Sequence, residues 1–98
     1  MIKQLGEIKE LISSHKDEIH KEYKIMNIGI FGSYVRNEQN EESDLDILVE
    51  FDEPISMFKF VELEYYLEEL IGIKIDLVSK KALKPVIGSY INSEVEYV

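Results

Sequence analysis

The sequence contains no cysteine. The chain can therefore form neither disulfides nor thiolate metal sites, and cysteine usage says nothing about its compartment. No apolar run approaches the roughly 20 residues that a membrane span needs. The first residues also lack the basic-then-apolar form of a signal peptide. We therefore expect a cytoplasmic protein without a membrane partner.

Basic residues are scarce: 11 lysines and arginines stand against 20 acidic residues, for a net charge of −9. Proteins that bind nucleic acid usually carry a basic stripe, so we expect no direct nucleic-acid binding. An acidic pocket can still accept ATP, because divalent cations locally reverse its sign. The charge balance thus tolerates a metal–nucleotide complex and favours a basic protein partner, while solubility alone explains most of these charges equally well.

The composition, 45% hydrophobic and 32% charged over 98 residues, predicts a single folded domain over 1–98. Hydrophobic periodicity predicts its order: a helix over about 1–23, a strand over 27–31, a short helix over 34–36, a strand ending near 51, a helix over 57–71, a strand over 73–79 and a helix from 85. Ser56 is expected to cap the helix that Gly72 ends. The tail over 94–98 is too short to classify. We predict an α+β fold with a small three-stranded mixed sheet packed with helices.

Two aspartates lead into the second predicted strand. Residues two apart on a strand share a face, so Asp44 and Asp46 would lie about 6.6 Å apart at ~3.3 Å per residue. The alternation puts them with Leu48 and Glu50, and leaves an apolar opposite face for the core. The two acids must then face away from the core, where both could reach one cation or two cations ~4 Å apart.

A Gly-Ser turn follows the first predicted strand. Gly32 permits a backbone geometry that resists a side chain and lets a phosphate approach. Ser33 can cap a short helix, whose free amides suit a triphosphate. Taken alone, a Gly-Ser pair is an ordinary turn. Its position between a strand and a downstream acid pair favours phosphate binding.

A further aspartate lies on the third predicted strand. Asp76 alternates with Ile75 and Leu77, which would share the core face. If this strand pairs beside the second, Asp76 could come near Asp44 and Asp46. Otherwise it is a solvent-facing acid on an edge strand.

These residues carry a family resemblance. Gly32-Ser33, ten residues and then Asp44-x-Asp46 resembles the signature of the DNA polymerase β-type nucleotidyltransferases. Arg36 and Ser43 make the chain similar to the minimal nucleotidyltransferases (MNT), over about 28–98. One departure is Asn37, where the family often has glycine, but asparagine tolerates positive φ.

The resemblance implies a nucleotidyltransferase-like fold and a set of site residues. Asp44, Asp46 and Asp76 would be the catalytic acids and the metal ligands, holding two Mg²⁺ ions, with Mn²⁺ as a substitute. Gly32, Ser33 and Arg36 would be nucleotide-binding. For Arg36, a salt bridge to a nearby acid is the structural alternative.

MNT proteins are typically antitoxins that transfer AMP to a tyrosine of an all-helical HEPN toxin, an RNase. The resemblance therefore implies a metal-dependent protein adenylyltransferase with ATP as donor and a HEPN-type toxin as partner. We expect no second domain to hold an acceptor, which agrees with an acceptor on another protein. Two alternatives stay open: a non-catalytic antitoxin that neutralises its partner by occlusion, and a small-molecule nucleotidyltransferase, which would need a substrate pocket.

Overall fold

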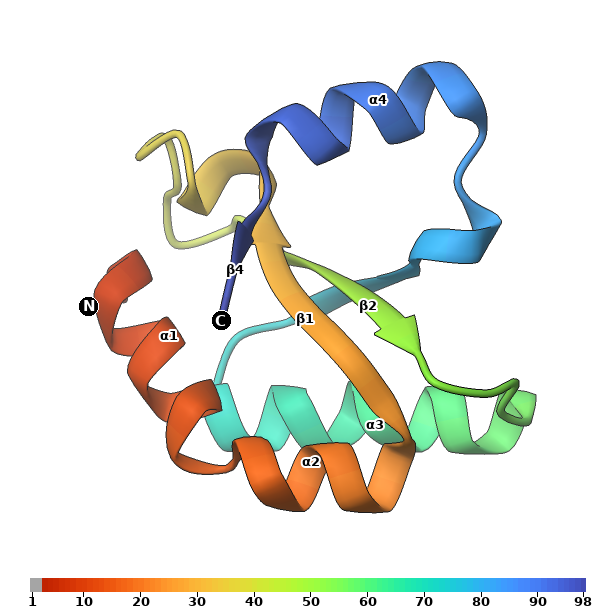
Figure 1. Ribbon diagram of the computed structural model, residues 1–98. Coiled ribbons are helices and arrows are strands. Elements are labelled where there is room, and N and C mark those ends of the chain that lie inside the picture. Colours follow the sequence, from red (N-terminus) through yellow and green to blue (C-terminus); the bar gives the residue numbers. More distant parts are fainter. Residues whose placement is uncertain (1–2) are drawn as a thin grey trace.

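The computed structural model describes residues 3–98. Its helices and strands follow one another in the order shown in Figure 1: α1 (Leu5–Ser14), α2 (Lys16–Tyr23), β1 (Ile25–Phe31), the 3₁₀ turn η1 (Gly32–Tyr34), β2 (Leu45–Phe51), α3 (Met57–Ile71), β3 (Ile75–Ser79), the 3₁₀ turn η2 (Lys80–Ala82), α4 (Pro85–Glu94) and β4 (Glu96–Tyr97). The predicted α+β class and mixed sheet are confirmed.

The long helix α3 begins and ends where the sequence predicts. The Ser56 hydroxyl accepts a hydrogen bond from the Lys59 amide at 3.2 Å, which satisfies one free donor of the first turn. Gly72 ends the helix in the left-handed conformation at φ 80°, which glycine adopts without steric cost. Within 3–98, no helix is long and apolar enough to cross a membrane.

The predicted N-terminal helix is in fact two helices, α1 and α2, that meet at His15. The Ser14 hydroxyl and the His15 ring both lie within hydrogen-bond distance of the Leu11 carbonyl, at 2.8 and 3.1 Å. Side-chain bonds of this kind compete with the helical ladder and favour a break. Periodicity missed the break because both helices bury apolar residues, Ile12 and Ile19 among them. Met1 and Ile2, which the prediction included, lie outside the described residues.

The sheet has strand order β3-β2-β1-β4. β2 pairs antiparallel with β1 and parallel with β3, so it is a central strand with a partner on each side. The parallel pair is possible because α3 carries the chain back to the starting edge of the sheet. β1 begins two residues before the prediction and β3 two residues after it.

The fourth strand, β4, comes from the tail that the sequence left unclassified. Gly29 pairs with Tyr97 and Ile30 with Glu96, antiparallel. The C-terminal segment approaches β1 so closely that a Cβ on Gly29 would lie 2.6 Å from the side chain of Val95, just before β4, and 3.1 Å from that of Tyr97 within it. A glycine in β1 thus admits the C-terminal segment, and the three predicted strands become four.

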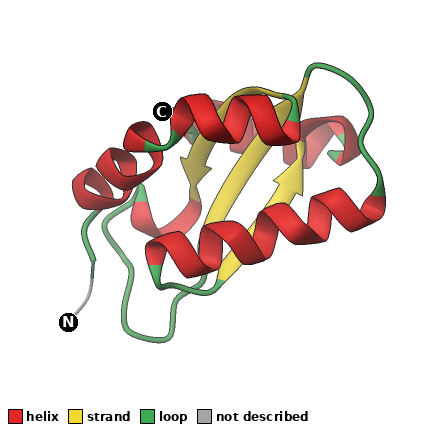
Figure 2. Cartoon of the chain, turned by 90° about the horizontal axis from the view of Figure 1, so that it is seen from below, coloured by secondary structure: helices red, strands yellow, loops and turns green. Residues whose placement is uncertain are grey.

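Helices cover both faces of the sheet, but unequally. The larger core lies between the sheet and α1, α2 and α3. Helices α2 and α3 lie below the strands in Figure 1 and therefore in front of them in Figure 2, which is seen from below. The fully buried side chains of this core are Ile8, Ile12, Ile19, Ile25, Ile28, Ile30, Leu45, Ile47, Val49, Leu63, Leu67 and Ile71. On the opposite face α4 covers a small cluster of Phe31, Leu48 and Ile91. The face that carries the predicted acids is therefore partly covered rather than fully open.

The buried face of α3 should dominate its contribution to stability. We expect Leu63→Ala, at a site with 0% exposure, to lower the free energy of unfolding by about 2–5 kcal/mol through lost burial and a residual cavity. Phe58→Ala on the same helix, at 88% exposure, should change it by less than about 0.5 kcal/mol. Urea unfolding of both variants checks this, and equal losses would contradict the described packing of α3.

Candidate active site

Two of the three predicted acids face each other across neighbouring strands. Asp46 of β2 and Asp76 of β3 are direct register partners, on strands that lie about 4.8 Å apart. Asp46 is half-buried and Asp76 is exposed. The predicted pairing of these strands is confirmed, and it sets the two carboxylates side by side.

The third acid, Asp44, stands just ahead of this pair. It precedes β2, which begins at Leu45, so it lies on the incoming loop rather than on the strand as predicted. The loop is held by the Leu45 amide, which donates to the Lys74 carbonyl at 2.8 Å. Within residues 3–98, no three acidic, histidine or cysteine side chains are grouped as a metal ion would require. The described site is thus a close pair with one exposed carboxylate beside it.

Electrostatics show that the pair is short of positive charge. Burial, the charge of Asp76, a hydrogen bond with Asp76 and the charge of Asp44 together raise the pKa of Asp46 to about 6, against an opposing effect of Arg36. Two carboxylates this close cannot both ionise freely. A bound cation would relieve the repulsion between them, so the donor set fits a divalent metal ion, which prefers carboxylate oxygen.

The Gly-Ser turn packs directly against Asp46. Gly32 has φ 81°, and a Cβ built there would lie 3.0 Å from the Asp46 carboxyl carbon and closer still to its oxygen. Glycine is therefore required here by conformation and by space. After the turn, Asn37 has φ 59°, as its predicted tolerance allowed, and the Glu38 amide donates to the Ser33 carbonyl at 2.9 Å.

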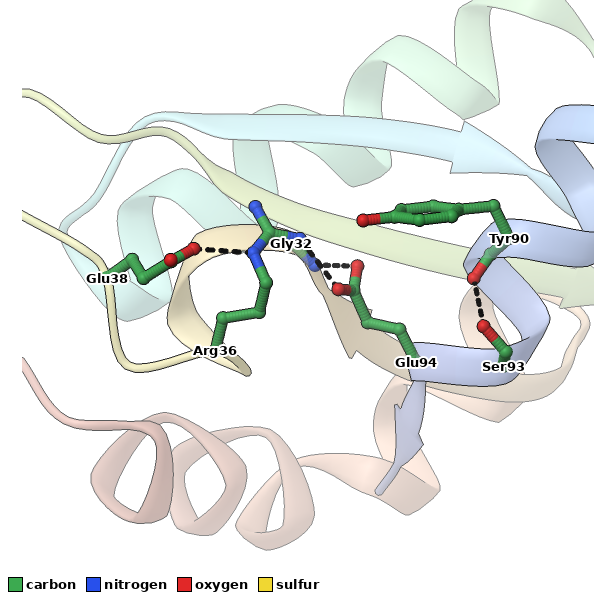
Figure 3. Close-up of polar contacts among 6 residues, drawn as sticks. All are labelled: Gly32, Arg36, Glu38, Tyr90, Ser93 and Glu94. Atoms are coloured by element: carbon green, nitrogen blue, oxygen red, sulfur yellow. Dashed lines mark hydrogen bonds and ion pairs between the residues drawn. The ribbon is translucent and has the colours of Figure 1, made fainter.

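Arg36 forms the salt bridge that was the structural alternative to phosphate binding. Its Nε contacts the Glu38 carboxylate and its Nη1 the Glu94 carboxylate, both at 2.6 Å (Figure 3). The second oxygen of Glu94 accepts the Gly32 amide at 2.9 Å. Burial opposes ionisation of Glu94, but the Arg36 contact and the Gly32 amide outweigh it and hold the pKa of this carboxyl below its ordinary value.

Glu94 is the residue of the site that sequence reasoning missed. It lies in the last turn of α4, where the helix dipole favours cations over carboxylates. That mismatch was the only available signal, and it is weak by itself. Nearby, Tyr90 of α4 points its ring toward Arg36 (Figure 3).

Two hollows of the surface lie around β2. One, of 540 Å³, is lined by Tyr34, Asp44 and the loop over 40–43, and so adjoins the acid site. The other, of 340 Å³, is lined mainly by Phe51, Ile55, Met57 and Phe60 at the opposite end of the strand, away from the acids. Of these two hollows, the one at the start of β2 thus lies beside the predicted acids.

A mixed sheet with an acid pair across adjacent strands, beside a strand–Gly-Ser turn, is the arrangement that the resemblance to the nucleotidyltransferases predicted. Comparison with known families agrees: the nucleotidyltransferase domain matches residues 12–98, and the chain belongs to this family.

Individual relatives of the chain are named as protein adenylyltransferases and minimal nucleotidyltransferases. Protein adenylyltransferase MntA of Thermococcus cleftensis is 49% identical over 94 residues, which are 96% of this chain and 95% of the relative. A solved structure provisionally described as a minimal nucleotidyltransferase superposes with a TM-score of 0.75 at 28% identity, covering 91% of this chain and 93% of that one.

A complex of a tri-AMPylated Shewanella oneidensis HEPN toxin with its MNT antitoxin contains the same fold. The TM-score is 0.66 at 20% identity, covering 91% of this chain and 70% of that chain. At that identity the likeness concerns the fold.

The raised pKa of Asp46 predicts an unusual pH dependence. In metal-free buffer with EDTA, Asp46→Asn should raise the Tm at pH 7.5, because it removes like-charge repulsion. The advantage should shrink as the pH falls from about 6 toward 4, where the folded parent takes up its proton and regains stability. Each kcal/mol relieved corresponds to about 4–8 °C in a chain of this size.

The control for this comparison is Asp52→Asn, an exposed aspartate in the turn after β2. Its Tm difference from the parent should stay nearly constant over the same pH range. A constant difference for Asp46→Asn as well, measured by thermal melts from pH 4 to 8, would contradict the described carboxylate pair.

Proposed function

We propose that this protein is a metal-dependent adenylyltransferase that transfers AMP from ATP to a tyrosine hydroxyl of a HEPN-type toxin, and so acts as its antitoxin. The observation that carries the proposal is the Asp46–Asp76 register pair beside the Gly32–Ser33 turn. Acids held together in this way have a use when they bind cations, since their mutual repulsion otherwise costs stability.

Each predicted site residue has a role in this proposal. Asp44, Asp46 and Asp76 would hold one or two Mg²⁺ ions, or Mn²⁺ in their place. Such ions, when bound, neutralise the triphosphate and lower the pKa of the attacking hydroxyl, which is ~10 for free tyrosine. The backbone and hydroxyl of Ser33, with Gly32, would contact the triphosphate.

Arg36 would contribute positive charge to the same triphosphate. Its Nε and Nη1 already bind carboxylates, but a guanidinium has five donors in a planar fork. In the reaction, the tyrosine oxygen forms a bond to the α-phosphorus, the bond from this phosphorus to the bridging oxygen breaks, and pyrophosphate leaves as the hydroxyl proton is released.

The relatives support the acceptor and the partner. The Thermococcus protein, similar over nearly its whole length, is named a protein adenylyltransferase. The Shewanella complex pairs an MNT antitoxin with a HEPN toxin that carries AMP. An acidic chain with net charge −9 suits encounter with a basic RNA-cleaving partner. Catalytic modification, rather than occlusion alone, explains why the acid pair is assembled.

Metal and nucleotide binding gives the first test. MgATP should raise the Tm of the parent, because a ligand bound only to the folded state stabilises it, by about 2.7 kcal/mol at 100 times its Kd. Asp44→Asn combined with Asp46→Asn should abolish the rise. Glu50→Gln, on the same strand at the other end, should keep it. If the double variant responds like the parent, the assignment of the site is wrong.

Transfer itself gives the second test. Incubation of a HEPN-type protein from the same genome with this protein, ATP and Mg²⁺ should add one or more AMP groups to a tyrosine, seen by intact-mass and peptide mass spectrometry. Asp76→Asn should reduce labelling by at least about 100-fold, as expected when an essential charge-stabilising group is removed. A partner that is inhibited but remains unmodified would favour occlusion.

A further inference from the structure

Glu94, at the C-terminal end of α4, contacts Gly32 at the start of the Gly-Ser turn and Arg36 shortly after the turn. Its carboxylate accepts from the Gly32 amide at 2.9 Å and from Arg36 Nη1 at 2.6 Å, and the side chain is only 13% exposed. Both contacts are charge-assisted, a class roughly twice as strong as neutral hydrogen bonds. One side chain therefore connects two groups of the turn to an element 58 or more residues away in sequence.

The place of Glu94 follows from the short strand β4. Ile30 is the antiparallel partner of Glu96. Continuing that register by two residues sets Gly32 opposite Glu94, just beyond the end of the paired segment. The pairing of β4 with β1 thus places the Glu94 carboxylate beside the turn.

The contacts of Glu94 keep in place two groups that lie beside Asp46 and Ser33: the Gly32 backbone and the Arg36 guanidinium. Gly32 lies against the Asp46 carboxyl group, with no room for a Cβ. Arg36, the single arginine of the sequence, lies at the other end of the turn. Movement of either would change the space beside the acid and the direction of the guanidinium.

We propose that Glu94 is a positioning residue for nucleotide binding: it fixes the Gly32–Ser33 turn and the orientation of Arg36 toward the triphosphate. This inference rests on the proposed function, since it concerns the same site. The opposite effect, in which Glu94 weakens nucleotide binding, is also testable. A carboxylate bound to the Gly32 amide and the Arg36 guanidinium could compete with phosphate for these two groups. The two effects change nucleotide affinity in opposite directions.

The test uses α,β-methylene-ATP, an analogue whose α–β linkage cannot be cleaved. Its affinity for the full chain in the presence of Mg²⁺ is measured by calorimetry. Glu94→Ala should weaken binding about 10-fold, the lower end of losses seen when groups that orient a site are removed. Glu94→Gln should lose less, because its amide oxygen can still accept from Gly32. In transfer assays the KM for MgATP should rise by more than kcat falls.

Two control variants separate positioning from charge and from stability. Glu38→Ala removes the other carboxylate on Arg36 without touching Gly32, and Glu96→Gln removes a nearby carboxylate that binds Lys9. Glu96→Gln should bind within about 2-fold of the parent. Glu38→Ala should lose less affinity than Glu94→Ala, because it removes one contact of Arg36 and leaves the Gly32 amide bound. Thermal melts of every variant, with binding measured well below each Tm, exclude loss of folded protein as the cause of weaker binding. If Glu94→Ala is too unstable to measure, Glu94→Gln takes its place.

Three results would overturn the inference. Glu94→Ala and Glu94→Gln could bind like the parent, could bind more tightly, or could change in parallel with Glu38→Ala. The second would show that Glu94 competes with phosphate, and the third that its contact with Gly32 contributes nothing beyond the carboxylate contact with Arg36 that Glu38 also makes. Failure of the parent itself to bind the analogue or to transfer AMP would overturn the proposed function as well, so the two failures are distinguishable.

Discussion

The register of β2 against β3 is the constraint on which the site depends. A shift of one residue in this parallel pair would move every side chain of β3 to the other face. Ile75 and Leu77, both nearly fully buried, would then lose the core, and Asp76 would enter it. Burial of two apolar side chains therefore holds two like-charged carboxylates together, at a cost that a bound cation would relieve.

The central position of β2 extends this constraint to the turn. Asp46 is the register partner of Asp76 on one side and of Phe31 on the other. Because Gly32 directly follows Phe31, the turn is placed against the Asp46 carboxylate by strand pairing. The acids and the turn are thus parts of one arrangement, and a side chain at position 32 would disturb both.

The C-terminal segment completes the acid face of the sheet. Ile91 packs on Phe31 and Leu48, which are themselves buried, and so docks α4 beside the site. Val95 and Tyr97 pass over Gly29, where the missing side chain leaves room for β4. Between these two anchors lies Glu94, whose carboxylate reaches the turn. A short strand of two residues is marginal alone, but here it continues a packed helix.

Several features could be predicted from the sequence because their causes are local. The alternation of Leu45, Ile47 and Val49, the cap at Ser56 and the glycine at position 72 depend on neighbours within a few residues. The Gly-Ser turn and the Asp-x-Asp spacing likewise lie within one short stretch. These patterns were sufficient for the α+β class and for selecting Asp44, Asp46 and the Gly-Ser turn, whereas the choice of Asp76 and Arg36 rested on the family resemblance.

Other features follow from contacts between distant residues, and only the tertiary structure decided them. The break at His15 does not disturb the apolar spacing, since the core accepts the buried faces of both helices. β4 exists because Gly29, far away in sequence, leaves space for it. Glu94 meets Gly32 and Arg36 across 62 and 58 residues, and no local pattern encodes such a pairing. The sequence by itself determined which groups are available for the chemistry, because residue type and short spacing suffice for that. Their actual neighbours were decided by strand register and helix docking, because these depend on burial summed over the whole chain.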